Sequence, residues 1–331
     1  MKCLFVWLLC LLPVACLCRD RQLLATEFRK ADSIALAHAN HSLSDLDLLA
    51  SRLTRALNAD EAKFRAIYKW VCDNISYDRT TYLENKRMRA KLSKEALEAW
   101  NAWVTLKVFR ELVSHRRTVC TGYAWLVKEL AQRAGLPCVV IDGYGRNVTS
   151  NIGGQGIPNH SWNAVELNSR WYLCDATWSA GAIDVASGVF VPKFNDAYFL
   201  ADPAIFIRNH YPLDPQWSLL KQTPSLQWFL DGPLLYSAAL QYDVQPVGPE
   251  QFEIHLSRGD TVAIAFTSLD PAVGHVMLHV GNQLLESKTV SIRDGGGKEF
   301  VFRYRCRNRG IFAANVMVNT DWVIGYKLRV K

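Results

Sequence analysis

The sequence predicts an α+β protein followed by a separate all-β unit. Apolar residues recur at helical spacing through the first part of the chain, and three strand-like runs follow them. The last part consists of short alternating runs broken by turn residues. The chain has 331 residues, of which 50% are hydrophobic, so it can bury a sizeable core in two units.

The N-terminus has the composition of a secretory signal. Residues 1–18, MKCLFVWLLCLLPVACLC, carry one lysine, an apolar run too short to span a membrane, and then small residues. The stretch LPVAC resembles a bacterial lipobox and makes Cys16 a candidate for lipidation. Ordinary cleavage nearby and an uncleaved anchor are the alternatives. We therefore expect an exported protein, periplasmic or attached to a membrane through a lipid on Cys16 if the source is bacterial.

Two helical segments follow the signal. Residues 19–58 are amphipathic and are expected to form an N-terminal helical segment. The next segment, EAKFRAIYKWVCDNISYD, covers residues 61–78, and Asn58 and Asp60 are placed to cap its helix. Its expected core face is formed by Phe64, Ile67, Val71 and Ile75.

Two further helices lead to the predicted sheet. ALEAWNAWVTLKVFRELV, residues 96–113, has helical periodicity. Another helix is expected from Cys120 onward, and Gly135 and Pro137 stop it. Three strands come next, CVVIDGYG, HSWNAVEL and RWYLCDATW, and the turn residues NSR join the last two. Helices followed by an antiparallel sheet are the pattern of an α+β domain.

The pattern changes again in the last third of the sequence. Residues 203–250 are rich in proline and tryptophan without a steady period, and QYDVQPVGPEQ is expected to be a linker. About seven alternating runs fill residues 245–331, which predicts a small β-sandwich. The predicted division is a signal in 1–18, a helical segment in 19–58, the core with its trailing segment in 59–240, and the sandwich in 245–331.

Charge and motifs exclude several classes of function. The formal net charge is +7, and the short basic run Lys86, Arg87, Arg89 and Lys91 has no aromatic residues interleaved, so we expect no nucleic-acid partner. The stretch HVMLH lacks the glutamate of a zinc-hydrolase HExxH helix. The glycines of NIGGQG lack the strand-to-helix context of a phosphate-binding loop. We therefore expect no metal and no cofactor.

Cysteine usage separates one thiol from the others. Five cysteines lie beyond the signal region, and their spacing fits neither a zinc ribbon nor a disulfide scaffold. Cys72, Cys138 and Cys174 lie in apolar stretches, where a thiol acts as a small hydrophobe. Cys306 lies in the predicted sandwich. Cys120 differs from these because it stands at the start of a predicted helix.

Cys120, His160 and Asp175 are the candidate catalytic residues. A cysteine in the first turn of a helix faces unpaired N–H groups and the positive end of the helix dipole, which favour the nucleophilic thiolate. His160 begins one predicted strand and Asp175 lies near the end of the next, so an antiparallel hairpin makes them neighbours. A carboxylate that orients an imidazole beside a thiolate is an arrangement for acyl transfer. We therefore expect the three side chains to converge.

The segments that carry these residues resemble a known family. TVCTGYAWLVKELAQRAGLPCVVIDGYG, NHSWNAVELNSRWYLCDATW and RAIYKWVCDNISYD are similar to the three signature blocks of the transglutaminase-like superfamily, and nearest to its subgroup related to kyphoscoliosis peptidase. The resemblance covers residues 60–210 and implies a cysteine-protease-like α+β core followed by an immunoglobulin-like domain. It also implies Cys120 as nucleophile, His160 as base and acid, and Asp175 as the residue that orients His160.

The resemblance implies acyl transfer through a thioester on Cys120. The protein would then be a papain-like or transglutaminase-like cysteine peptidase, amidase or crosslinking enzyme that acts on peptide or isopeptide amides. The candidates for oxyanion or substrate contacts are Trp70, Tyr77, Gly122 and Trp162. The expected partner is a protein or peptide, and export alone suggests that it belongs to the cell envelope. The alternative is a non-catalytic cell-envelope interaction module on the same fold.

Overall fold

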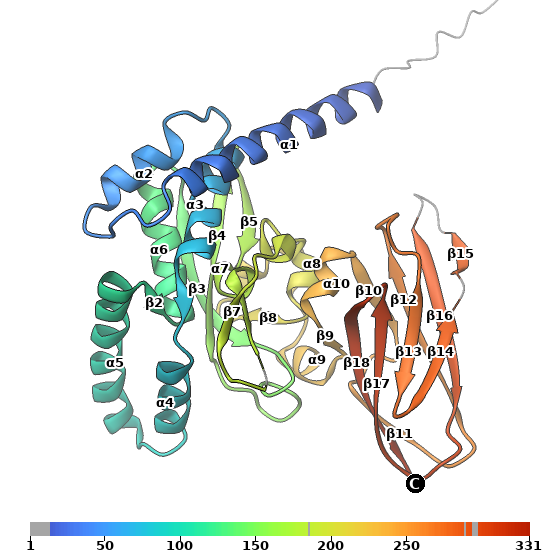
Figure 1. The fold of residues 1–331 in the computed structure, drawn as a ribbon. Helices are drawn as coiled ribbons and strands as arrows, with labels where there is room; N and C mark the ends of the chain where they lie inside the picture. Colours follow the sequence, from blue (N-terminus) through green and yellow to red (C-terminus); the bar gives the residue numbers. More distant parts are fainter. Residues whose placement is uncertain (1–13, 185, 288, 293–296) are drawn as a thin grey trace, which may run out of the picture.

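The structure is a computed structural model that describes residues 14–184, 186–287, 289–292 and 297–331. A helix-rich part that encloses a small sheet lies beside a part built of long strands, as Figure 1 shows. The predicted α+β class of the core is confirmed. Most of the predicted signal lies outside the described residues, and residues 14–18 begin helix α1 (Val14–Ala37). No helix in the described part of the chain is both long and apolar enough to cross a membrane.

Helices α1, α2 (Leu46–Thr54), α3 (Asp60–Asn74) and α6 (Cys120–Arg133) share one apolar core with one face of the sheet. The core face predicted for α3 is confirmed, because Phe64, Ile67, Val71 and Ile75 are all buried. The predicted cap of α3 is wrong. Its N-cap is Ala59, which makes no side-chain cap bond. Asp60 lies in the first turn instead, where its negative charge interacts favourably with the helix dipole.

The sheet of the core has four strands in the order β5-β4-β3-β8. They are β3 (Cys138–Gly145), β4 (His160–Leu167), β5 (Arg170–Cys174) and β8 (His210–Pro212). All neighbouring pairs are antiparallel, and Leu167 pairs with Arg170 across the predicted hairpin. Asn168 and Ser169 in its turn have φ values of 51° and 61°, as a two-residue hairpin turn requires. The hairpin therefore sets the register of β4 against β5.

Two apolar cores lie on opposite sides of this sheet. Val165 and Leu167 of β4 belong to the core that the helices share, whereas Trp162 and Ala164 belong to a second core. The alternation follows from the two-residue period of a strand. The short elements after β5 are α7 (Ala176–Ala180), β6 (Gly181–Ile183), β7 (Phe190–Pro192), η1 (Asp196–Tyr198) and α8 (Pro203–Phe206). Tyr198 of η1 and Phe206 of α8 complete the second core, and Trp178 of α7 packs against it.

A helical hairpin connects α3 to α6. It consists of α4 (Arg79–Arg89) and α5 (Lys94–His115), and α5 includes the helix predicted over residues 96–113. Strand β1 (Ser76–Tyr77) precedes the hairpin and pairs in parallel with β2 (Arg117–Thr118), which follows it. This short pairing brings Tyr77 beside the residues that lead into Cys120.

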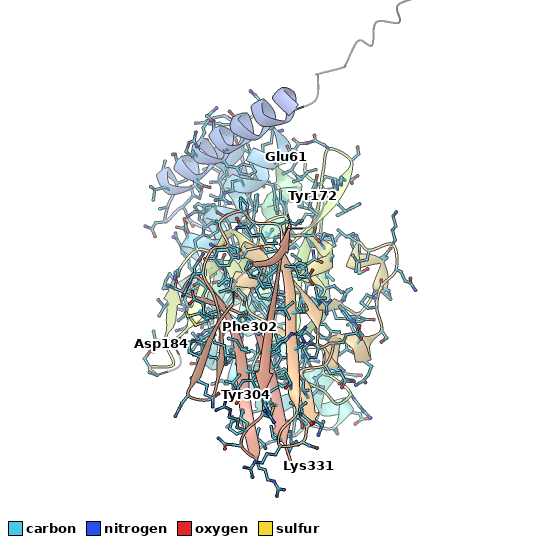
Figure 2. All side chains as sticks on the ribbon, turned by 90° about the vertical axis from the view of Figure 1, so that its right-hand side faces the viewer. Glu61, Tyr172, Asp184, Phe302, Tyr304 and Lys331 are labelled. Atoms are coloured by element: carbon cyan, nitrogen blue, oxygen red, sulfur yellow. The ribbon has the colours of Figure 1, made fainter. Side chains whose placement is uncertain are left out.

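The C-terminal part is a two-layer β-sandwich. Its sheets have the orders β10-β12-β16-β15 and β11-β18-β17-β13-β14, with β9 also paired to β18. Buried residues from both sheets form one core, and Figure 2, which looks onto the sandwich, labels Phe302 and Tyr304 of β16. The strands are β9 (Leu234–Leu235), β10 (Val244–Gly248), β11 (Glu253–Leu256), β12 (Thr261–Ser268), β13 (Val276–Val280), β14 (Gln283–Ser287), β15 (Thr289–Ile292), β16 (Lys298–Arg305), β17 (Gly310–Val318) and β18 (Asp321–Val330).

Two details of the predicted sandwich are wrong. The run QLLESKTVSI is divided between β14 and β15, which lie in different sheets. The expected linker QYDVQPVGPEQ contains β10, which pairs with β12. The elements that precede β10 along the chain are η2 (Pro215–Ser218), α9 (Leu226–Asp231), β9 and α10 (Ser237–Gln241). Leu235 of β9 and Ala239 of α10 are buried in the sandwich core, so residues before the predicted linker help to build the sandwich.

This shared core gives a stability prediction. Leu235 is 3% exposed and packs in the sandwich core, so Leu235→Ala should lower the free energy of unfolding by about 2–4 kcal/mol. The matched control is Val247→Ala on β10, where the side chain is 47% exposed and the expected change is within about 0.5 kcal/mol. Denaturant unfolding of the full chain measures both. Equal effects of the two substitutions would contradict the shared core.

Candidate active site

Cys120 is the first residue of α6, a helix of 14 residues. The N-cap residue Val119 makes no side-chain cap bond, so no side chain competes for the first amides of the helix. Cys120 is 8% exposed, whereas Cys138 is 1% and Cys174 is 0% exposed. All five cysteines beyond the signal region are free and buried. Cys120 therefore combines a helix start with more solvent contact than Cys138 or Cys174 has.

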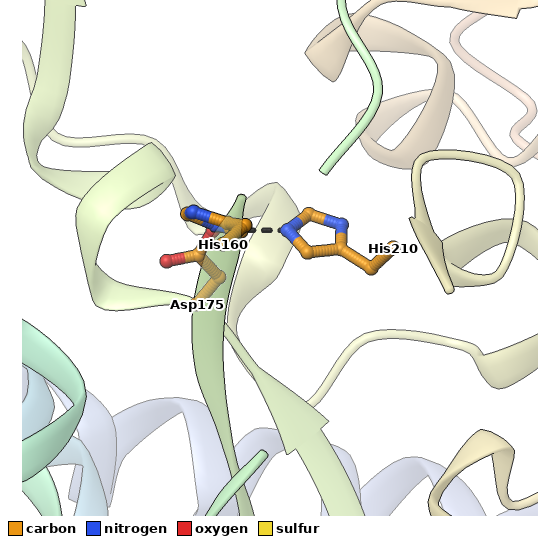
Figure 3. A group of neighbouring side chains, drawn as sticks. All are labelled: His160, Asp175 and His210. Carbon is orange, nitrogen blue, oxygen red and sulfur yellow. Dashed lines mark hydrogen bonds and ion pairs between the residues drawn. The ribbon is translucent and has the colours of Figure 1, made fainter. Parts of the chain in front are cut away.

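His160 and Asp175 are direct partners, as the sequence predicts. His160 begins β4, and Asp175 follows the last residue of β5 and caps α7. His160 Nε2 lies 2.7 Å from Asp175 Oδ2, and Figure 3 shows the two side chains together. Because Nε2 is engaged with the carboxylate, Nδ1 is the ring nitrogen left for a second partner.

Four donors surround the Asp175 carboxylate. Oδ1 accepts hydrogen bonds from the backbone N–H groups of Thr177 at 2.8 Å and Trp178 at 3.3 Å. Oδ2 lies 2.7 Å from His160 Nε2 and 3.0 Å from His210 Nε2. The Asp175 side chain is 1% exposed, so these donors replace the water that a charged carboxylate needs.

The pKa values of Asp175, His160 and Cys120 are all shifted in the direction that favours their charged forms. Burial raises the pKa of Asp175, but His160 and His210 hold it well below its usual range. Burial lowers the pKa of His160, yet Asp175 and Cys120 raise it to about 10. Burial raises the pKa of the Cys120 thiol, but hydrogen bonding with His160 and the Ser161 backbone lowers it below its ordinary value. Asp175 is therefore ionised near pH 7, and His160 shifts Cys120 toward the thiolate form.

Tyr77, one of the four oxyanion or substrate candidates, lies close enough to Cys120 to feel its charge. Burial, followed by the neighbouring Cys120, raises the pKa of Tyr77 well above its usual value, so its hydroxyl keeps its proton. In register, Tyr77 pairs with Thr118, two residues before Cys120. A neutral phenol beside the nucleophile can donate a hydrogen bond to a developing oxyanion.

The structure shows how the other three candidates pack, and it does not test their proposed contacts. Trp70 is fully buried on α3, and its indole N–H already donates to the carbonyl of His38 at 2.8 Å. A Cβ on Gly122 would lie 2.0 Å from Thr118 Oγ1, so glycine allows α6 to pack closely on β2. Trp162 is 1% exposed, and its ring lies 6.0 Å from that of His160, so it forms part of the wall behind the imidazole.

Sequence reasoning did not single out His210. The residue lies on β8, in a part of the chain without a steady period, and β8 joins the sheet beside β3. Only this pairing brings His210 to Asp175. The aromatic rings of Trp178 and Phe206 lie 4.4 Å and 4.1 Å from the His210 ring. They keep water from the bond between His210 and Asp175.

His160, Asp175 and His210 also have ligand atoms within 4.8 Å of one another, a spacing that can hold a metal ion. However, the two Nε2 atoms face Asp175 Oδ2 at hydrogen-bonding distances of 2.7 and 3.0 Å. Such bonds need protons on both nitrogens, whereas a histidine that binds a metal must offer a free lone pair. We therefore describe the three residues as a hydrogen-bonded cluster.

The comparisons with known proteins agree with this geometry. Residues 47–176 match the profile of the family described as the Transglutaminase-like superfamily. The chain carries a transglutaminase-like domain. The matched residues include Cys120, His160 and Asp175, whereas His210 lies beyond them.

Three curated proteins resemble the chain beyond this domain. The kyphoscoliosis peptidases of Homo sapiens and Mus musculus are each 31% identical to it over 261 residues, which are 78% of this chain and 36% of each relative. Hillarin of Drosophila melanogaster is 27% identical over 231 residues, 65% of this chain and 26% of that protein. The aligned part of the chain thus spans 36% of the length of each kyphoscoliosis peptidase.

The lowered thiol pKa gives a labelling prediction. In the folded protein Cys120 should react with iodoacetamide faster than Cys138 or Cys174, because burial raises the pKa of both other thiols. The midpoint of the rate against pH should lie below about 8.5, the value of an ordinary cysteine, because the thiolate persists at lower pH. Peptide mapping with mass spectrometry measures the three rates. Equal rates at Cys120 and Cys138 would contradict the assignment of the nucleophile.

Proposed function

We propose that the protein is a thiol enzyme that transfers acyl groups from peptide or isopeptide amides. The observation that carries this proposal is the buried bond between His160 and Asp175. The position of Cys120 at the start of α6, and the lowering of its pKa by His160, support it as the nucleophile. The match to the transglutaminase-like superfamily supports the proposal, since the resemblance to that family implies a cysteine-protease-like core. The name of the relative in Homo sapiens describes that protein as a peptidase.

In the first step Cys120 Sγ attacks the amide carbonyl carbon, and the carbonyl oxygen becomes negatively charged. The backbone N–H of Cys120 and the hydroxyl of Tyr77 are our candidates for stabilising this oxyanion. The imidazolium of His160 then gives its Nδ1 proton to the amide nitrogen. The carbon–nitrogen bond breaks, the amine leaves, and a thioester remains on Cys120.

In the second step a nucleophile attacks the thioester carbonyl. His160, now neutral, takes the proton of this nucleophile at Nδ1, the carbon–sulfur bond breaks, and the thiolate returns to its pair with the imidazolium. Asp175 stays ionised throughout and stabilises the imidazolium. Water as acceptor gives a peptidase or amidase, and an amine gives a crosslinking enzyme. The proposed roles of Cys120, His160 and Asp175 define the acyl step and leave both acceptors open.

Two further proposals concern the location of the protein and the role of its C-terminal sandwich. We propose an exported protein, with lipidation of Cys16 as one route of membrane attachment, because the first residues have the composition of a signal. We also propose that the sandwich is immunoglobulin-like and helps to hold a protein substrate. Its two-sheet packing around one core supports this assignment.

An acyl-enzyme test addresses the reaction itself. Incubation with a peptide ester or amide should add the mass of the acyl group to the protein, and Cys120→Ala should abolish the adduct because the nucleophile is lost. Intact-mass spectrometry with and without an added amine then identifies the acceptor. Cys138→Ala is the matched control, since that thiol is buried and its pKa is raised to about 12. A chain that forms no adduct although Cys120 labels rapidly would contradict acyl transfer and favour the interaction module.

The role of Asp175 gives a second test. Asp175→Asn keeps the size of the side chain, but its oxygen must accept from the backbone N–H groups of Thr177 and Trp178. The amide NH₂ then faces His160 Nε2, which drives the imidazole to the tautomer with its proton on Nδ1. We expect turnover to fall about 100-fold or more with the fold retained, measured by kinetics and circular dichroism. Turnover near that of the unchanged protein would leave a pair of Cys120 and His160 without Asp175.

A further inference from the structure

We propose that His210 is a positioning residue that holds the Asp175 carboxylate in place, so that His160 keeps the orientation and the proton affinity that acyl transfer needs. This inference rests on the proposed function. It concerns a residue beyond the range that matches the family, on a strand whose pairing brings it to the site. His210 Nε2 lies 3.0 Å from Asp175 Oδ2, the same oxygen that lies 2.7 Å from His160 Nε2. Figure 3 shows the two rings approaching Asp175 together.

His210 is fixed on several sides. Its side chain is 0% exposed, and its ring stacks on Phe206 with a centroid distance of 4.1 Å and an angle of 18°. Its Nδ1 lies 2.6 Å from Oδ1 of Asn209, and the NH₂ group of Asn209 donates to the hydroxyl of Tyr198 at 3.2 Å. Stacking and the contacts at both nitrogens thus fix the orientation of the ring, with Nε2 directed at Asp175 Oδ2.

The charge state of His210 suits a donor. Burial lowers the pKa of His210 to about 4, although Asp175 acts in the opposite direction, so the ring is neutral near pH 7. A neutral imidazole carries one N–H, and the contact with the carboxylate places it on Nε2. Its Nδ1 then accepts, so the proposal requires the amide of Asn209 to be flipped from the orientation in the structure, where Oδ1 faces Nδ1, so that its NH₂ group faces His210. In that orientation the amide oxygen faces the Tyr198 hydroxyl, which can donate to it.

His210 does not take part in the chemistry directly. Its one N–H is engaged with Asp175, and its buried ring lies among Trp162, Trp178, Tyr198 and Phe206. It therefore acts through Asp175. Without this donor, Oδ2 would keep a single N–H partner in a buried site, and the carboxylate would turn or bind a proton more readily. Either change weakens its support for the imidazolium of His160.

Other titratable groups near Asp175 do not supply a substitute charge. Burial raises the pKa of each, so they are neutral near pH 7: Tyr68, Cys72, Tyr77, Tyr123, Cys174 and Tyr198. The groups whose charge changes at the site are thus Cys120 and His160. The proton affinity of His160 is therefore a clean readout of how well Asp175 is held.

The experiment compares two substitutions by nuclear magnetic resonance of ¹⁵N-labelled histidine. His210→Phe keeps an aromatic ring to stack on Phe206 but loses the donor. His210→Gln loses the ring but places an amide N–H near the position of Nε2. We expect the proton affinity of His160 to fall about tenfold or more in His210→Phe and to stay within about threefold in His210→Gln. If turnover is measured as well, kcat should fall with KM nearly unchanged, because His210 does not reach the substrate.

The matched control is Tyr211→Phe on the same strand. Tyr211 donates to the carbonyl of Pro224 at 3.0 Å, and its side chain alternates with that of His210 along β8. The Tyr211→Phe substitution should leave the proton affinity of His160 unchanged. An unchanged affinity in His210→Phe, or an equal fall in His210→Gln, overturns the proposal, because the N–H would then not matter.

A measurement on the unchanged protein keeps the proposal falsifiable if His210→Phe does not fold. Its spectrum should show His210 as the neutral tautomer with the proton on Nε2, and the opposite tautomer overturns the proposal. These readouts need no substrate. Absence of the acyl adduct with normal resonances would therefore contradict the proposed function alone, whereas the wrong tautomer contradicts the role of His210 alone.

Discussion

The buried, ionised carboxylate of Asp175 is the constraint on which the site depends. A charge that is 1% exposed costs several kcal/mol unless hydrogen bonds replace its water. Here the donors come from three elements: the start of α7, the first residue of β4 and the first residue of β8. Each element must be in place before the charge can be buried. The chemistry of His160 therefore depends on the packing of the elements that surround Asp175.

The helix that carries the thiol is tied to the same sheet. Asn163 on β4 donates to the carbonyls of Ala124 on α6 at 2.9 Å and Val139 on β3 at 3.1 Å. Gly122 lets the first turn of α6 approach Thr118 closely. Small changes in these contacts would move Cys120 relative to His160. The position of the thiol thus depends on buried contacts that take no part in the chemistry.

The helices, the hairpin and the candidate residues could be predicted because their signals are local. The period of α3 fixed its buried face, and the turn residues between β4 and β5 fixed their pairing, which made His160 and Asp175 neighbours. The cap of α3 and the division of the run QLLESKTVSI were missed. Those features depend on which sheet a segment joins and on how neighbouring turns pack, and propensity does not encode either.

The sequence by itself determined that a thiol stands at a helix start and that a histidine and a carboxylate face one another across a hairpin, since both follow from short-range periodicity. Only the tertiary structure decided that β8 joins the sheet beside β3, and with it that His210 reaches Asp175. The same holds for Leu235 and Ala239, which lie before the expected linker yet complete the sandwich core. The pairing of strands that are distant along the chain depends on which apolar surfaces become buried together. Local sequence patterns do not specify that choice.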